Sequence, residues 1–236
     1  KEEVLDLPPK IRSTEYVDMN PSQRKIYNEV RTQLIEDIDK VMLSSNPLAE
    51  TIRLRQTTGN PQILTTKKVK SAKFERAMEI VEECLDNDES VIVFSNWEQV
   101  ISGFYEYCKP RLPTYLVTGN TQDKFDEIGR FTSDKRPSVI CGTIGALGTG
   151  FTLTKATTVI FLDSPWTRGE KDQAEDRAHR IGAESTVNII TLVCKDTIDE
   201  TIEDIVASKG ELADYIVDGV PLKNKLSTVM DLLLKR

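Results

Sequence analysis

The residues of this chain whose types and spacing best suit chemistry are two arginines, Arg177 and Arg180, in a charged segment that is predicted to be helical. Residues three positions apart share one face of an α-helix, so both guanidinium groups would project to the same side. Two guanidiniums on one face can bind the charge that spreads over a phosphoryl group during its transfer. The alternative is a solvated basic face, in which the arginines pair with the neighbouring carboxylates Glu170, Glu175 and Asp176.

A glycine-rich loop precedes this segment. The apolar run 138–141 has the composition of a buried strand, and glycines follow it at Gly142, Gly145, Gly148 and Gly150. Because glycine has no Cβ, its backbone N–H group can approach a phosphate closely. Thr143 adds a hydroxyl that suits a nucleic-acid phosphate. The same glycines would also permit a tight turn without a ligand. The loop has no GxGxxG dinucleotide fingerprint, and the chain has no GxxxxGK[ST] phosphate loop.

The order and spacing of these segments resemble those of a known family. Residues 173–182, with the sequence QAEDRAHRIG, are similar to motif VI of the Swi/Snf-type ATPases of helicase superfamily two. Residues 143–153 resemble motif V of the same family, and residues 163–166 resemble the segment between the two motifs. The resemblance extends from residue 7 to about residue 220, although position 183 is alanine where the family usually carries glutamine.

The resemblance implies a nucleotide site that is shared between two lobes. Arg177 and Arg180 would act as arginine fingers that reach across a cleft to the γ-phosphate of ATP. Gln173 would help to hold the geometry between the lobes, and Gly148 and Gly150 would line the nucleotide site. ATP and Mg²⁺ would be bound mainly by a first RecA-like lobe that precedes this chain. We therefore expect this chain alone to be inactive as an ATP hydrolase.

The resemblance also implies contacts with the backbone of double-stranded DNA. The residues expected to make them are Ser95, Asn96, Thr118, Gly119, Thr143 and Trp166. Alternatives stay open at each place. Ser95 and Asn96 could cap the following helix, and residues 118–119 could form a turn alone. Trp166 could cover a hydrophobic patch. Residues 54–56, with the sequence LRQ, are similar to a stretch of the family but equally suit helical packing, so no site role is predicted for them.

The elements that must position these residues alternate between strands and helices. Short apolar runs predict strands at 91–94, 114–117, 137–141, 156–162 and 187–193. Helical periodicity and capping residues predict helices that start at Asn20-Pro21, near Pro47 and after Ser71, and others at 97–108, 121–131, 168–181, 197–208 and 222–233. Residues 11–18 suit a short strand or an extended entry.

This alternation is typical of an α/β fold. We expect a RecA-like parallel sheet with helices on both faces, plus an N-terminal helical segment and C-terminal helices. Residues 1–70 are expected to form an extended entry and helices that pack on the lobe. Residues 71–220 would be the RecA-like lobe itself, and residues 221–236 a C-terminal helix.

Composition limits the function classes. The net charge of −7 and the pI near 5.0 are unusual for a dedicated nucleic-acid-binding domain, so any DNA contact must be local. The scattered cysteines favour a reducing compartment and no metal site. No apolar run is long enough to span a membrane, and the start is no targeting peptide. We expect an intracellular protein, cytoplasmic if bacterial or viral and nuclear if eukaryotic. His179, the only histidine, is expected to make a packing hydrogen bond.

These features lead to one preferred hypothesis and two alternatives. The preferred hypothesis is the second motor lobe of an ATP-dependent translocase of double-stranded DNA, whose partners are duplex DNA and the first lobe. The first alternative is a lobe of an RNA or single-strand helicase from the same superfamily. The second is a non-catalytic interaction domain that retains the fold.

Overall fold

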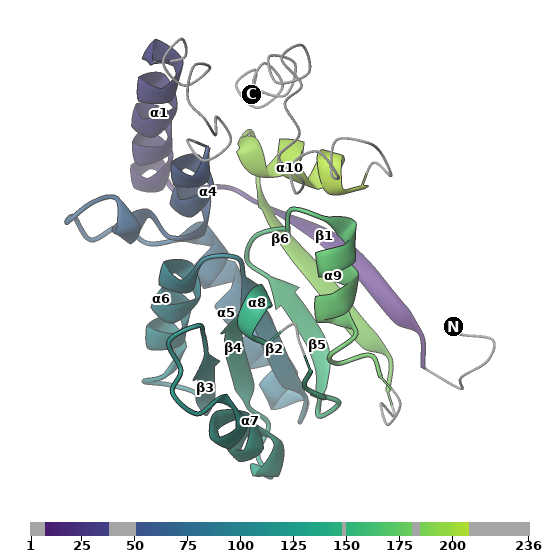
Figure 1. Ribbon diagram of the computed structural model, residues 1–236. Coiled ribbons are helices and arrows are strands. Elements are labelled where there is room, and N and C mark those ends of the chain that lie inside the picture. The colour runs from purple at the N-terminus through teal and green to yellow at the C-terminus, as the bar shows by residue number, and fades with distance from the viewer. Residues whose placement is uncertain (1–7, 38–50, 148–149, 181–184, 208–236) are drawn as a thin grey trace.

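The computed structural model describes residues 8–37, 51–147, 150–180 and 185–207, and its strands form one sheet (Figure 1). Six strands lie in the order β1-β6-β5-β2-β4-β3, and every neighbouring pair is parallel. The strands are β1 (Lys10–Val17), β2 (Ser90–Ser95), β3 (Thr114–Val117), β4 (Val139–Thr143), β5 (Ala156–Phe161) and β6 (Val187–Cys194). The predicted RecA-like α/β fold is confirmed.

The central strand β2 explains why the apolar runs form this sheet. All its residues are buried, as expected for a parallel strand that is covered on both faces. Successive side chains point to opposite faces. Accordingly, Ile92 and Phe94 belong to the hydrophobic cluster on one face, whereas Val91 and Val93 belong to the cluster on the other.

Helices cover both faces of the sheet (Figure 1). The first cluster includes residues of α7 (Lys124–Ser133), α8 (Ile144–Leu147) and α9 (Arg168–Glu175). The second includes residues of α5 (Ala72–Asp86) and α6 (Glu98–Cys108). The predicted start of α5 is confirmed, because the hydroxyl of Ser71 accepts a hydrogen bond from the backbone N–H of Phe74 at 3.2 Å.

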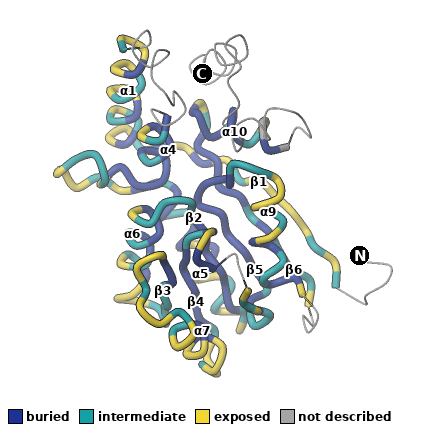
Figure 2. Tube along the Cα trace, viewed as in Figure 1, coloured by how far each residue is buried: buried dark blue, intermediate teal, exposed yellow. Residues whose placement is uncertain are grey.

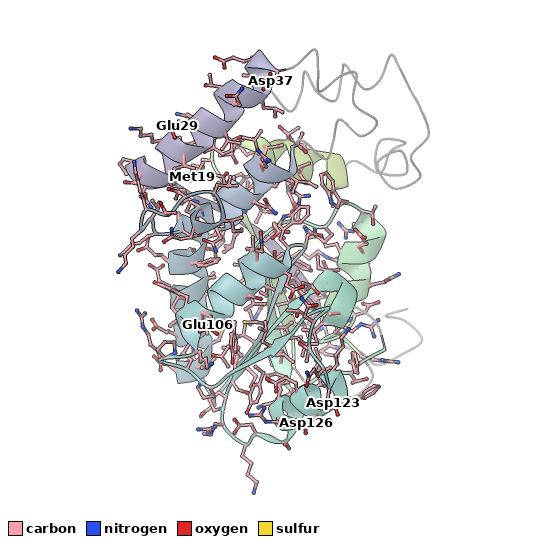
Figure 3. All side chains as sticks on the ribbon, turned by 60° about the vertical axis from the view of Figure 1, so that its left-hand side comes forward. Met19, Glu29, Asp37, Glu106, Asp123 and Asp126 are labelled. Carbon is pink, nitrogen blue, oxygen red and sulfur yellow. The ribbon has the colours of Figure 1, made fainter. Side chains whose placement is uncertain are left out.

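A third cluster lies where β1 and β6 end. It packs α1 (Pro21–Glu36), α4 (Ile52–Gly59) and α10 (Ile198–Ala207) together, and a short 3₁₀ helix, η1 (Pro61–Ile63), follows α4. Asn20 caps α1, as predicted, by accepting a hydrogen bond from the N–H of Gln23 at 2.9 Å. Figure 3 shows Met19 at the start of α1, with Glu29 and Asp37 further along it.

β1 was predicted only as a strand or an extended entry, and it is an edge strand of the sheet. It pairs with β6 from Lys10 opposite Val187 to Val17 opposite Cys194. Most of its residues are exposed, whereas the central strands are buried along their lengths (Figure 2). The first strand in the described sequence therefore lies beside the last one, β6.

The predicted helix at 168–181 is wrong at its end, because α9 stops at Glu175. The following residues form tight turns, in which the N–H of Arg177 bonds to the carbonyl of Ala174 at 3.2 Å. The carbonyl of Arg177 accepts from the distant N–H of Leu153 at 2.9 Å and so takes no part in a continuing helix. Arg177 and Arg180 thus do not share a helix face. The helix predicted at 222–233, the helix start at Pro47 and the predicted site residue Gly148 lie outside the described residues.

Candidate functional site

A buried carboxylate, Asp163, organises the carboxyl edge of the central strands. Asp163 is 1% exposed and accepts hydrogen bonds from the hydroxyl of Ser95 at 2.5 Å and from the backbone N–H of Asn96 at 2.9 Å. The side-chain amide of Asn96 also donates to it. Ser95 is buried, so its hydroxyl serves this network. The α6 helix has Trp97 at its N-cap position without a side-chain cap of its own, and the hydroxyl of Ser95 accepts a hydrogen bond from the N–H of Trp97 at 3.0 Å.

The connection after β5 is held to this network. The carbonyl of Ser164 accepts from the side chain of Asn96 at 2.8 Å and also from Nη2 of Arg55. Trp166 is partly buried and packs against the third hydrophobic cluster. Its ring lies 4.1 Å from the guanidinium carbon of Arg55, measured to the ring centroid. No role is predictable for Arg55 from the sequence alone, although its LRQ segment resembles a stretch of the family.

The turn after β3 contains Thr118 and Gly119. The hydroxyl of Thr118 donates to the carboxylate of Glu98 at 3.2 Å, and the side-chain amide of Asn120 donates to the same carboxylate at 2.7 Å. Thr118 is buried, whereas Gly119 and Asn120 are exposed. The N–H of Thr118 donates to the hydroxyl of Thr121 at 2.9 Å, which stabilises the turn. The exposed part of this turn is therefore backbone and amide, with an acidic side chain beneath it.

In the glycine-rich segment, one glycine is needed for close packing and another for its backbone conformation. Thr143 ends β4 directly beside Ser95 of β2, and it is partly exposed. A Cβ on Gly142 would lie 2.2 Å from the Cδ1 atom of Leu147, so this glycine permits α8 to approach the sheet. Gly150 has φ of +81°, a left-handed conformation that glycine adopts without strain. A turn and a ligand-binding loop are both compatible with these features.

Arg177 and Arg180 face the segment that follows Gly150. Nη1 of Arg177 donates to the carbonyl of Phe151 at 3.1 Å, and its Nε donates to the carbonyl of Gln173 at 3.1 Å. Nη1 of Arg180 donates to the hydroxyl of Thr152 at 3.2 Å. Burial lowers the pKa of Arg177, and the positive charge of Arg180 lowers it further. Two like charges are therefore held close to each other on one short segment.

The nearby carboxylates pair with β1 instead. Glu175, whose side chain is fully buried, forms ion pairs with Lys10 at 3.1 Å and with Arg12 at 2.6 Å. Lys10 also pairs with Asp176 at 3.0 Å. The hydrogen bond to Glu175 raises the pKa of Arg12. Glu170 forms a capping box at the start of α9. Within the described part of the chain, neither Arg177 nor Arg180 has a carboxylate ion-pair partner, so the pairing of that alternative is not formed, although Arg180 is exposed.

The arginine turn and the predicted DNA contacts lie at opposite ends of the strands. Leu153, which binds the carbonyl of Arg177, lies just before β5 begins. His179 makes the expected packing hydrogen bond, through Nε2 to the carbonyl of Pro8 at 2.7 Å, just before β1 begins. The arginine turn is therefore at the amino ends of these strands. Trp166 and the other predicted DNA contacts follow carboxyl ends. The predicted site residues therefore fall into two separate groups, the arginine turn and the predicted DNA contacts, and α9 connects them.

Metal ligands and membrane spans are not found among the residues that the structure describes. No group of three or more His, Cys, Asp or Glu side chains in these ranges could hold a metal ion. No helix in the same ranges is long and apolar enough to cross a membrane.

Comparison with known proteins gives consistent similarities. The family model described as the helicase conserved C-terminal domain matches residues 72–182. A protein of Mycoplasma pneumoniae named an uncharacterized ATP-dependent helicase is 34% identical over 218 residues, which is 90% of this chain and 21% of that protein. A second relative, from Mycoplasma genitalium, is likewise covered over 21% of its length. The chain therefore spans about a fifth of the length of these relatives.

Solved structures also show a similarity to helicase-like ATPases. The SWI2/SNF2 ATPase core of Sulfolobus solfataricus in complex with dsDNA has a TM-score of 0.79 at 25% identity, with 98% of this chain and 51% of that chain covered. The C-terminal domain of the same ATPase has a TM-score of 0.71 at 23% identity and covers 94% of this chain and 99% of that chain, which supports the fold. Together with the parallel sheet and the order of its motifs, these similarities identify the chain as a C-terminal helicase lobe of the Swi2/Snf2-type ATPases in helicase superfamily two.

Proposed function

We propose that this lobe is the second motor lobe of an ATP-dependent translocase of double-stranded DNA, and that Arg177 and Arg180 bind the γ-phosphate of ATP held mainly by a preceding lobe. The observation that carries the proposal is the partition of charge around the end of α9. The carboxylates of Glu175 and Asp176 pair with β1. The two guanidiniums are left with neutral oxygen partners.

This partition suits a phosphate ligand. Among the described residues, Nη2 of Arg177 and both Nε and Nη2 of Arg180 have no hydrogen-bond partner. Two adjacent cations without a counter-ion repel each other, and a nearby anion relieves that repulsion. A γ-phosphate with its developing negative charge is such an anion, and guanidinium donors match its oxygens in geometry. Gln173, which is exposed one turn earlier, and Gly150 would complete this wall of the site.

The proposed DNA contacts lie on the carboxyl edge. Asn96, Gly119, Thr143 and Trp166 are at least partly exposed there and would meet the DNA backbone. Ser95 and Thr118 are buried and act through the residues that they orient, Asp163 and the 118–121 turn. Contacts of this kind bind phosphates without reading the sequence. A related ATPase core has been solved in complex with dsDNA, which supports duplex DNA as the partner.

Within the lobe, ATP would be bound by the arginine pair, while the preceding lobe would bind Mg²⁺. The described residues offer no cluster of metal-binding side chains. An arginine finger contributes to turnover by stabilising charge on the transferring phosphoryl group. This division of labour predicts that the 236-residue chain alone hydrolyses no ATP above background.

The test uses the full-length polypeptide that carries this chain. Arg177→Ala and Arg180→Ala are each expected to lower the DNA-stimulated ATPase turnover by about 10³ to 10⁵. Arg168→Ala is the matched control, because Arg168 lies at the start of α9, is 46% exposed and, among the described residues, pairs with Asp172; it should change turnover by less than about twofold. Normal turnover in Arg177→Ala would refute the finger assignment.

The choice of nucleic acid tests the second half of the proposal. ATP turnover is measured with duplex DNA, single-stranded DNA and RNA at the same salt concentration, because backbone binding depends on salt. Stimulation by duplex DNA is expected. Stimulation by RNA or by single strands alone would favour the helicase alternative, and no stimulation by any of them would favour a non-catalytic domain.

A further inference from the structure

Arg55 of α4 lies between the two tryptophans of the chain, Trp97 and Trp166. We propose that Arg55 is the positioning residue that fixes the orientation of Trp166 and so sets the DNA contact of the motor. This inference rests on the proposed function. Arg55 itself would touch neither DNA nor nucleotide.

The burial of Arg55 is unusual for a charged side chain. Arg55 is 1% exposed, and its Nε and Nη1 atoms have no hydrogen-bond partner among the described residues. Burial lowers its pKa, while the more distant charges of Asp163, Asp199 and Glu170 raise it. Buried donors without partners are costly. A residue that served only to fill this space would be better apolar.

The aromatic rings compensate for part of this cost. The guanidinium carbon lies 4.1 Å from the centre of the Trp166 ring and 5.6 Å from that of Trp97. A cation over an indole face is attracted by the ring quadrupole, and the attraction is larger when water is excluded. Trp97 packs against the α5–α6 cluster and Trp166 against the cluster at the ends of β1 and β6. Arg55 therefore joins the two clusters at the carboxyl edge of the sheet.

Arg55 also binds the backbone beside Trp166. Its Nη2 atom donates to the carbonyl of Ser164, which also accepts from Asn96 at 2.8 Å. The hydroxyl of Ser164 donates to Glu203 of α10, and Lys171 of α9 bonds to the same carboxylate at 2.8 Å. Arg55 and Asn96 thus hold the carbonyl of Ser164, and Glu203 holds its hydroxyl. Arg55 also lies over the Trp166 ring.

This arrangement separates two consequences of losing Arg55. Ser164 keeps the bond that its carbonyl accepts from Asn96 and the bond that its hydroxyl donates to Glu203, so the loop should stay in place. The indole of Trp166 loses its cation and becomes free to reorient. Lysine should not replace arginine here, because its ammonium is compact and strongly hydrated and cannot stack as a plane or reach Ser164 in the same geometry.

Tryptophan fluorescence tests the positioning directly. In a Trp97→Phe background of the 236-residue chain, Trp166 is the only tryptophan. Arg55→Lys and Arg55→Met should raise the population of undocked Trp166 about 2- to 30-fold, the range that corresponds to the strength of a cation–π contact. The readout is faster quenching of Trp166 by acrylamide. Arg53→Met is the matched control, because Arg53 is exposed on the same helix, and it should leave quenching unchanged.

The motor role is tested in the full-length polypeptide. Arg55→Lys should lower displacement of a triplex-forming strand from duplex DNA more than it lowers DNA-stimulated ATP turnover, because Trp166 still meets DNA but in the wrong orientation. Should Arg55→Met fail to fold, as judged by circular dichroism, Arg55→Lys decides the matter. Wild-type quenching in Arg55→Lys would overturn the positioning. Altered quenching with wild-type strand displacement would overturn its role in the motor. Absence of DNA-stimulated turnover in the wild type would instead refute the proposed function, and the quenching result would stand.

Discussion

The charge cluster at Glu175 offers a prediction that combines stability with activity. The side chain of Glu175 is fully buried, and Lys10 beside it is 8% exposed. Arg12 binds both oxygens of Glu175, at 3.1 and 3.0 Å through Nε and at 2.6 Å through Nη2. If either cation is lost, the other still pairs with the carboxylate of Glu175. Only the loss of both leaves a buried, uncompensated negative charge.

The magnitudes follow from this geometry. Removing the only partner of a buried charge costs about 3–5 kcal/mol. Lys10→Met should therefore cost only about 1 kcal/mol, because Arg12 remains. Arg12→Met should cost no more, because the side chain of Arg12 is 41% exposed and solvent screens its charge. The double variant should lose about 3–5 kcal/mol, which exceeds the sum expected for independent sites. Adding Glu175→Gln should recover much of this loss.

Thermal and urea unfolding of the 236-residue chain provide the measurement. For a domain of this size, each kcal/mol corresponds to roughly 2–4 °C in Tm. Lys70→Met serves as a control, because Lys70 is 78% exposed and its pair with Glu75 lies on the surface. An additive double variant, or one that Glu175→Gln does not rescue, would refute the interpretation. In the full-length polypeptide, the double variant should also lower ATP turnover at saturating DNA, because the turn that carries Arg177 follows Glu175 directly.

Three further predictions concern packing and titration. Gly142→Ala should cost about 1–3 kcal/mol in urea unfolding, because the new Cβ would lie 2.8 Å from the carbonyl oxygen of Val117 as well as against Leu147. Tyr27→Phe should destabilise the chain at pH 8, since it removes the acceptor of the Ile198 N–H, now at 2.9 Å. Burial raises the pKa of Tyr27; its proton is therefore retained in the folded state above the unfolded pKa near 10. Stability should thus fall as pH rises above that value, and Tyr27→Phe should make this fall shallower between pH 8 and about 11. Burial also raises the pKa of the four thiols, those of Cys84, Cys108, Cys141 and Cys194. Ellman's reagent at pH 8 should therefore react slowly with these thiols in the folded chain and quickly after unfolding.

Local chemistry made much of the fold predictable. The apolar runs gave the strands because a parallel strand covered on both faces must be apolar along its length, as β2 is. The capping side chains of Asn20 and Ser71 gave helix starts because they satisfy N–H groups within three residues. Asp123 caps α7 in the same manner, by accepting from the N–H of Asp126 at 2.9 Å, and both residues appear at that end of the helix in Figure 3. Its start at Lys124 is three residues later than predicted.

The errors arise where distant residues compete for local groups. The periodicity of residues 168–181 suits a helix, but the carbonyl of Arg177 binds Leu153, which lies in another loop. Sequence spacing cannot show which cation forms an ion pair with a given carboxylate in the folded chain. Glu175 pairs with Lys10 and Arg12 of β1 rather than with the arginines beside it, because β1 folds into the sheet edge next to α9. Arg55 is a similar case, since only the fold brings it between two tryptophans.

In the proposed motor, α9 connects the two groups of site residues. Its eight residues span about 12 Å, from the loop of Trp166 to the turn of Arg177. Its beginning is tied to α10 through Lys171 and Glu203, and its end is tied to β1 through Glu175. A short helix held at both ends moves as a unit rather than bending. A shift of the arginines toward a γ-phosphate would then also change the position of Trp166. Because β1 binds one end of this helix directly, a pull on the chain before β1 would act on the arginine turn first and reach the DNA edge through α9.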